Sequence, residues 1–139
     1  MAVKGPIVLI TALLLATRAA LGGTESTAGG EEAFDLPSGL TAQLQEMLWD
    51  RPGGGLVYRF RFVAPDFTGV ADFDTVMGDL AFLCAEFALP KLANTGPQPS
   101  QIIISLADKP SEFGVYNPDV TQVFEAYSVE NGTCIWEVF

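Results

Sequence analysis

The clearest alternation of apolar and polar positions lies in residues 56–63, "LVYRFRFV". Every second residue from Leu56 is apolar, and the intervening positions include Arg59 and Arg61. This period of two predicts a strand with one buried face. The preceding "DRPGGG" has the composition of a turn, and residues 40–49 before it fit either a strand or a helix. We favour a strand that forms a hairpin with 56–63.

A helix is predicted from Asp72 onward, because apolar residues recur there at spacings of three and four and share one stripe. The Asp72 carboxylate can cap the first turn, whereas Asp79 falls off the stripe. Pro90 disfavours the helical conformation in the residue before it, so we expect the helix to end near Leu89. The stripe consists of Phe73, Val76, Met77, Leu80, Cys84 and Phe87.

Three further strands are predicted in the second half of the chain. Residues 102–108, "IIISLAD", are typical of a strand buried on both faces. Asn131-Gly132 is the strongest short hairpin signal, and a two-residue turn there pairs Val129 with Cys134 and Tyr127 with Trp136.

Together these segments predict an α+β fold in which one main helix packs on a mostly antiparallel sheet of about five strands. Their order is strand, strand, helix, strand, strand, strand, within a single domain at 39–139. A composition of 49% apolar and 17% charged residues agrees with one globular core.

The N-terminus resembles a secretory signal peptide, with Lys4 before an apolar run and small residues after it. We expect a signal peptide at 1–22, export to the periplasm of a bacterium, and no stable membrane insertion after signal cleavage. The alternative is an uncleaved anchor at the inner membrane, although Arg18 interrupts the run before it reaches the length of a membrane span. Residues 23–38 are small, polar and acidic, and are predicted to be a flexible leader.

The two cysteines, Cys84 and Cys134, both point to the predicted core, one from the helix stripe and one from the last strand. Export to an oxidising compartment favours a disulfide between them. Two separate buried thiols are the alternative. A catalytic thiol is disfavoured because the chain has no histidine.

The chain carries a net charge of −10, which repels phosphate backbones and excludes nucleic acid as an expected partner. Without histidine, carboxylates are left for acid–base chemistry, and Asp72 with Asp79 or Glu46 with Glu125 are the candidate pairs. No cofactor and no metal site are predicted.

A candidate ligand or partner surface combines three groups of residues. Two arginines on one strand face can clamp an anionic ligand or pair with neighbouring acids. Polar side chains on a proline-rich loop are a second group, and aromatic residues without an evident place in the core are the third. These residues are Arg59 and Arg61; Asn94, Gln98, Ser100 and Gln101; and Trp49, Phe113 and Tyr116.

The strings "GPQPSQIIISLADKPSEFG" and "TQVFEAYSVENGTCIWEVF" resemble an uncharacterised family of small exported proteins of alphaproteobacteria, a domain of unknown function. The resemblance covers about 39–139 and includes "YRFRFVAP" and "CAEFALP". It implies a bacterial, periplasmic protein and carries over no catalytic residue.

The resulting hypothesis is an exported, non-enzymatic binding or interaction domain whose partner, a protein or a small molecule, is unknown. Two alternatives stay open: a small periplasmic hydrolase that uses carboxylates, and a structural subunit of a cell-envelope assembly.

Overall fold

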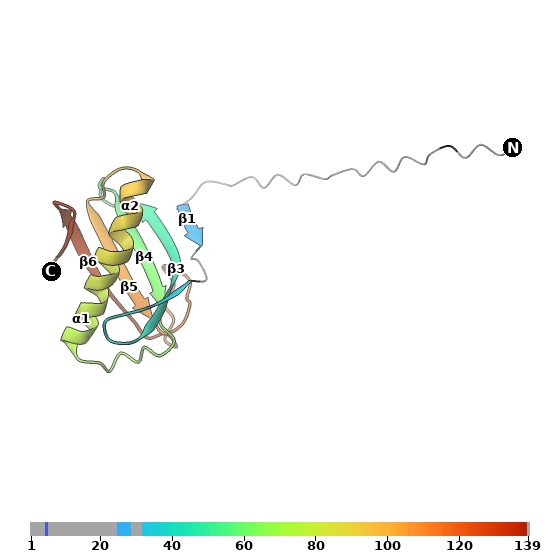
Figure 1. Ribbon diagram of the computed structural model, residues 1–139, viewed down its shortest axis with the longest axis vertical. Helices are drawn as coiled ribbons and strands as arrows, with labels where there is room; N and C mark the ends of the chain where they lie inside the picture. The colour runs from blue at the N-terminus through green and yellow to red at the C-terminus, as the bar shows by residue number, and fades with distance from the viewer. Residues whose placement is uncertain (1–4, 6–24, 29–31, 139) are drawn as a thin grey trace.

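The computed structural model describes residues 5, 25–28 and 32–138. A continuous helical rod lies across one face of a single curled sheet (Figure 1), so the predicted α+β class is confirmed. The strands are β1 (Glu25–Ala28), β2 (Ala33–Asp35), β3 (Thr41–Asp50), β4 (Val57–Val63), β5 (Gln101–Ala107), β6 (Gln122–Glu130) and β7 (Thr133–Trp136). The rod is α1 (Phe73–Phe82), a π-helical segment η1 (Leu83–Ala88) and α2 (Leu89–Thr95). The signal peptide predicted at 1–22 lies, apart from Gly5, outside the described residues.

The sheet is mixed and has the order β1-β3-β4-β5-β6-β7, with β2 also paired to β3. β4 and β5 are parallel, whereas the other pairs are antiparallel. Parallel neighbours need a crossover connection, and the helical rod supplies it between β4 and β5.

The sheet contains seven strands, so the predicted number of about five is too low. The two additional strands, β1 and β2, come from the segment predicted as a flexible leader. In β2, Phe34 stacks on Phe87 with 5.2 Å between ring centroids. A single aromatic residue in a short polar stretch is too weak a pattern to predict a strand.

The helix begins as predicted, because the Asp72 side chain accepts a hydrogen bond from the Thr75 N–H at 2.8 Å. This hydrogen bond lowers the pKa of Asp72 below the ordinary value for aspartate. The predicted end near Leu89 is wrong. Leu89 is helical, its N–H donates to the Cys84 carbonyl across the wider π turn, and Pro90 falls in the first turn of α2, where a missing N–H costs little.

The helix and the sheet enclose the main core, which is built from alternate residues of β4 and β5. Phe60 and Ile104 are fully buried there. The predicted disulfide between Cys84 and Cys134 is present and ties η1 to β7. The predicted hairpin pairing of Val129 with Cys134 is also confirmed.

Asp79, which was expected off the apolar stripe, is buried at 2% exposure. Its Oδ1 accepts a hydrogen bond from the Ser38 N–H at 3.0 Å. The helix therefore buries one carboxylate because a backbone donor of the loop before β3 satisfies it.

A β-bulge in β3 explains why residues 40–49 fit both a strand and a helix. The register shifts between Leu44 and Glu46, so apolar residues face the helix at Leu44 and again at Met47. A spacing of three across the bulge imitates helical periodicity. After the bulge, Glu46 and Asp50 share the face of Arg61 and Arg59.

The face of the sheet that the helix does not cover carries the alternate residues of β4, β5 and β6. The loop between β5 and β6, residues 108–121, folds back toward this open face and contacts Arg61 through Ser111. Within the described part of the chain, no helix has the length and apolar character to cross a membrane.

Candidate functional site

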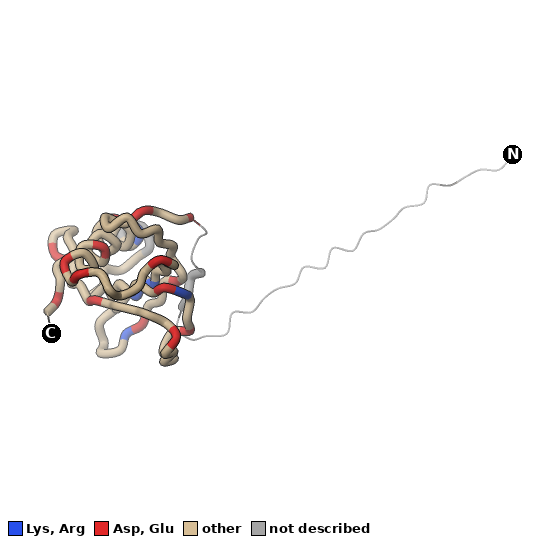
Figure 2. Tube along the Cα trace, turned by 90° about the horizontal axis from the view of Figure 1, so that it is seen from below, with Lys and Arg blue, Asp and Glu red and all other residues tan. Residues whose placement is uncertain are grey.

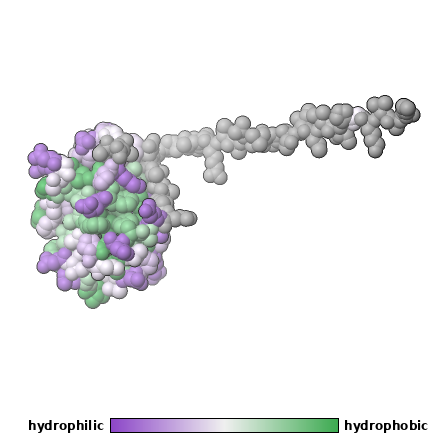
Figure 3. Space-filling model, viewed as in Figure 1, coloured by the Kyte–Doolittle hydropathy of each residue, from purple (hydrophilic) through white to green (hydrophobic). Residues whose placement is uncertain are grey.

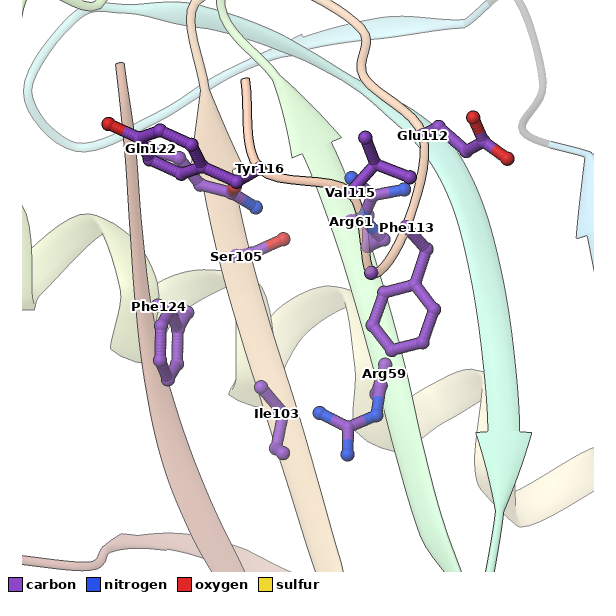
Figure 4. Close-up of a pocket in the computed structure, with 11 residues that line it drawn as sticks. Arg59, Arg61, Ile103, Ser105, Glu112, Phe113, Val115, Tyr116, Gln122 and Phe124 are labelled. Carbon is purple, nitrogen blue, oxygen red and sulfur yellow. The ribbon is translucent and has the colours of Figure 1, made fainter. Parts of the chain in front are cut away.

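The open face and the 108–121 loop form a trough of about 330 Å³ (Figure 4). β4, β5 and β6 supply its floor and one wall, and the loop supplies the other. The lining residues are Arg59, Arg61, Ile103, Ser105, Glu112, Phe113, Gly114, Val115, Tyr116, Gln122 and Phe124.

Arg61 fastens the loop to the sheet. Its side chain is buried and forms an ion pair with Glu46, and its Nη2 donates to the Ser111 hydroxyl at 3.0 Å. The neighbouring Gln45 amide donates to the Ser111 carbonyl at 2.8 Å. Because Gln45 lies in the bulge, the irregularity of β3 takes part in holding this loop.

Arg59 lies two residues earlier on the same face but is held less firmly. Its Nε is 3.8 Å from Asp50 Oδ1, too far for a hydrogen bond, and this Nε is buried without a hydrogen-bond partner among the described residues. The guanidinium carbon lies 5.3 Å from the ring centroid of Phe113. Arg59 therefore brings positive charge to the trough without a hydrogen-bonded acceptor in the part of the chain that is described.

The part of the floor that β5 supplies combines one apolar side chain with one hydroxyl. Ile103 and Ser105 point from β5 into the trough (Figure 4), and Ser105 is 6% exposed. No hydrogen bond joins the Ser105 hydroxyl or the Gln122 amide to another described side chain or backbone group.

The walls expose apolar side chains to solvent. Phe124 of β6 is 67% exposed, and Val115 and Tyr116 of the loop are 55% and 89% exposed. Phe113 is the least exposed of the aromatic walls, because Arg59 and Arg61 lie against its ring.

The trough also differs from the rest of the molecule in charge. Figure 2 shows acidic residues along most of the trace and few basic ones. Two of the five basic residues in the described ranges, Arg59 and Arg61, lie in this trough.

A second hollow of about 360 Å³ lies between the rod and the β2–β3 side of the sheet, over a group of phenylalanines. Lys91 already lies 4.8 Å from the centroid of the Phe87 ring in this hollow. Figure 3 shows the helix-bearing face, on which apolar surface is bordered by charged side chains. Because a cation of the chain itself covers the aromatic floor, this hollow is the weaker candidate.

The trough brings together four of the residues singled out in the sequence: Arg59, Arg61, Phe113 and Tyr116. Trp49 does not join them. It packs against the core on the helix-bearing side, so the expectation that it lies outside the core is wrong; the bulge in β3 turns it inward.

The polar residues of the proline-rich loop do not line the trough. The Ser100 hydroxyl donates to the Leu56 carbonyl at 3.0 Å, and Gln101 Nε2 donates to Glu137 Oε2 at 2.8 Å. Gln98 is exposed, and Asn94 belongs to α2, with its side chain outside the described set. Ser100 and Gln101 therefore support local structure.

The residues singled out in the sequence did not include Ile103, Ser105, Gln122 and Phe124. A signal was present for the first two, because they alternate with Ile102 and Ile104 and so must share the face opposite the helix. No signal showed that this face stays open.

The carboxylates of the two predicted acid–base pairs have separate partners. Glu46 lies on the open face beside Arg61, whereas Glu125 lies on the other face and accepts a hydrogen bond from Trp136 Nε1 at 2.9 Å. Asp72 caps the helix and Asp79 binds the Ser38 N–H. Across the described ranges, no group of three or more possible metal ligands occurs.

No curated protein and no solved structure shows significant similarity to this chain. A sequence model of one family matches residues 15–139, nearly the whole chain, and confirms the resemblance to a domain of unknown function. The chain belongs to DUF6497, a family of unknown function.

Proposed function

We propose that this protein is an exported, periplasmic, non-enzymatic domain that binds a small molecule in the trough of the open sheet face. One observation carries the proposal: the trough places the Ser105 hydroxyl and the Arg59 guanidinium, neither of them hydrogen-bonded to a described residue, between exposed apolar walls. A ligand in the trough can supply the hydrogen-bond partner that each of these two groups lacks within the described residues. A trough of about 330 Å³ is within the range of small-molecule sites.

Two features support export. The N-terminal residues have the pattern of a signal peptide, and the Cys84–Cys134 disulfide suits an oxidising compartment.

Binding is favoured over hydrolysis because the trough holds a single lining carboxylate, Glu112. The nearby Glu46 is paired with Arg61, and Asp50 lies 3.8 Å from Arg59 Nε. Hydrolysis by carboxylates needs an acid and a base that flank the scissile bond.

A structural role in an envelope assembly is the second candidate, and a separate surface favours it. Phe73 and Trp136 lie 6.2 Å apart between ring centroids and are 63% and 41% exposed. An exposed aromatic pair at the start of α1 and on β7 is a feature of protein contact sites.

The trough proposal is tested with N-phenyl-1-naphthylamine, an uncharged apolar dye whose emission rises in apolar sites. We expect the wild-type protein to enhance the emission and Phe124→Ser to lose most of the enhancement. Phe73→Ser is the matched control, because Phe73 is about as exposed as Phe124, 63% against 67%, but lies outside the trough.

Retention of the signal by Phe124→Ser together with its loss in Phe73→Ser would place the apolar site at the second surface. Absence of enhancement by the wild-type protein would contradict a small-molecule trough.

A further inference from the structure

We infer that the ligand of the trough is a small monocarboxylate with an apolar body, and that Arg59 binds its carboxylate. This inference rests on the proposed function of the trough and adds the chemical class of the ligand. It is carried by the different surroundings of Arg59 and Arg61.

The interactions of Arg61 are structural. It is 6% exposed, paired with Glu46 and hydrogen-bonded to Ser111. Removing Glu46 would leave the buried Arg61 charge uncompensated, which is costly. Arg61 is therefore a positioning residue, which holds Phe113 and the loop in place beside Arg59.

Arg59 has the properties of a ligand-binding arginine. Its side chain is 23% exposed, which leaves it accessible but partly removed from water. Its guanidinium lies at one end of the trough, beside Ile103 and Phe113 (Figure 4). A guanidinium presents five N–H donors in a planar fork that matches a carboxylate, and those of Arg59 make no hydrogen bond with any described residue.

Asp50 is a competitor but a weak one. It approaches the Nε edge of Arg59 at 3.8 Å, and its side chain is 34% exposed. Both facing atoms, Asp50 Oδ1 and Arg59 Nε, are buried, but at this distance no hydrogen bond forms between them. The outer edge of the guanidinium stays available, so a ligand carboxylate binds there against a modest repulsion from Asp50.

The rest of the trough fits an apolar body that extends away from Arg59. The path runs along Ile103 and over Ser105, between Phe113 and Phe124, toward Tyr116 (Figure 4). Aromatic and aliphatic walls favour an aryl or short alkyl chain. The Ser105 hydroxyl and the Gln122 amide lie beyond the carboxylate end and can accept or donate a hydrogen bond to a polar substituent on that body.

The test compares 4-phenylbutanoate with 4-phenylbutanamide, which have the same shape but differ in charge. Their binding to the oxidised protein is measured by calorimetry or by amide chemical shifts. We expect the carboxylate to bind about tenfold or more tightly than the amide, because hydrogen bonds to charged groups are the stronger class. Arg59→Gln should abolish this preference.

Asp50→Asn keeps Arg59 and removes its competitor. We expect this variant to bind the carboxylate several-fold more tightly and the amide unchanged. Arg59→Lys should retain part of the preference, since lysine keeps the charge but lacks the planar fork. Unchanged near-ultraviolet circular dichroism shows that the variants are folded.

The outcomes separate the two proposals. Equal binding of both probes, or a preference that survives Arg59→Gln, would overturn the carboxylate inference and leave the trough as a binding site. Weaker carboxylate binding in Asp50→Asn would overturn it too. If neither probe binds but the protein still enhances the dye emission in a manner that depends on Phe124, this ligand class is excluded. If the dye emission is not enhanced either, the proposal that the trough is a binding site is overturned.

Discussion

Two arginines separated by one residue on the same strand face have different environments and different roles. Alternation along residues 56–63 placed Arg59 and Arg61 together on the face away from the core, and the structure agrees. Alternation could not distinguish them, because the difference depends on Glu46 and Ser111, which come from other strands and loops. Sequence separation of 15 and 50 residues hides such partners.

At the same scale, Tyr127 is a buried residue whose polar group is unsatisfied. Its hydroxyl is buried and has no hydrogen-bond partner within the described part of the chain. Tyr127→Phe removes an unsatisfied polar atom and keeps the ring. We expect the variant to be as stable as the wild type or more stable by up to about 1–2 kcal/mol, measured by urea unfolding at pH 7; a loss of stability would show that the hydroxyl has a partner.

The same residue predicts an alkaline effect. Burial, with a contribution from the charge of Glu125, raises the pKa of Tyr127 to about 12. In the unfolded chain the phenol ionises near its ordinary pKa of about 10. Stability is therefore fully present below pH 10 and declines as the pH rises toward 12, because only the unfolded state releases the proton.

Urea midpoints between pH 9 and 11 measure this effect. Tyr127→Phe is the control and should lose less stability over that interval than the wild type. Parallel curves for the two proteins would contradict the raised pKa.

At the scale of elements, the sequence predicted the features that depend on a few adjacent residues. It did not predict the features that depend on packing against other elements. The Asn131-Gly132 hairpin and the Asp72 cap were foreseeable, because a turn with positive φ at both residues and a carboxylate before a helix are short-range features. The continuation of the helix through Pro90 was not foreseeable. It depends on the π turn at η1, which packs Cys84 and Leu83 into the core.

The disulfide is the strongest prediction at this scale. It closes a loop of 50 residues, and the chain-entropy model assigns about 4 kcal/mol to such a closure. We expect Cys84→Ala/Cys134→Ala to be destabilised by about that amount in urea unfolding. Amides of β7 should lose protection from hydrogen exchange before those of β5, because β7 pairs with β6 on one side and is tied to the rod by this bond.

The reduced wild-type protein is the matched control and should behave like the double variant. A loss below about 1 kcal/mol would show that the bridge leaves the unfolded ensemble almost unchanged.

At the scale of the whole molecule, charge is the dominant feature. The net charge is −10, so the acidic side chains repel one another in the compact state. We expect the thermal midpoint to rise as sodium chloride increases from about 0.01 to 0.3 M, because salt screens this repulsion. Lys109→Gln removes an exposed positive charge and should steepen the dependence; a midpoint that falls with salt in both proteins would mean that attractive ion pairs outweigh the repulsion.

The global arrangement was only partly accessible from the sequence. One helix on one sheet followed from the segments, but the parallel pairing of β4 with β5 did not. Each of the two strands also pairs with an antiparallel neighbour, β4 with β3 and β5 with β6. Their residue patterns do not indicate whether β4 and β5 themselves pair antiparallel or parallel. The trough was hidden for the same reason, since its floor is formed by side chains of these two strands and its wall by the loop after β5.

The two short strands at the N-terminal side of the sheet have a consequence for solubility. β1 and β2 pair with residues 46–49 and 41–43 of β3, and so occupy most of a ten-residue edge that would otherwise be open. Free strand edges are templates for aggregation between molecules. The sheet is therefore protected on this side by two short strands, and loss of that segment by proteolysis would expose the edge of β3 to pairing with another molecule.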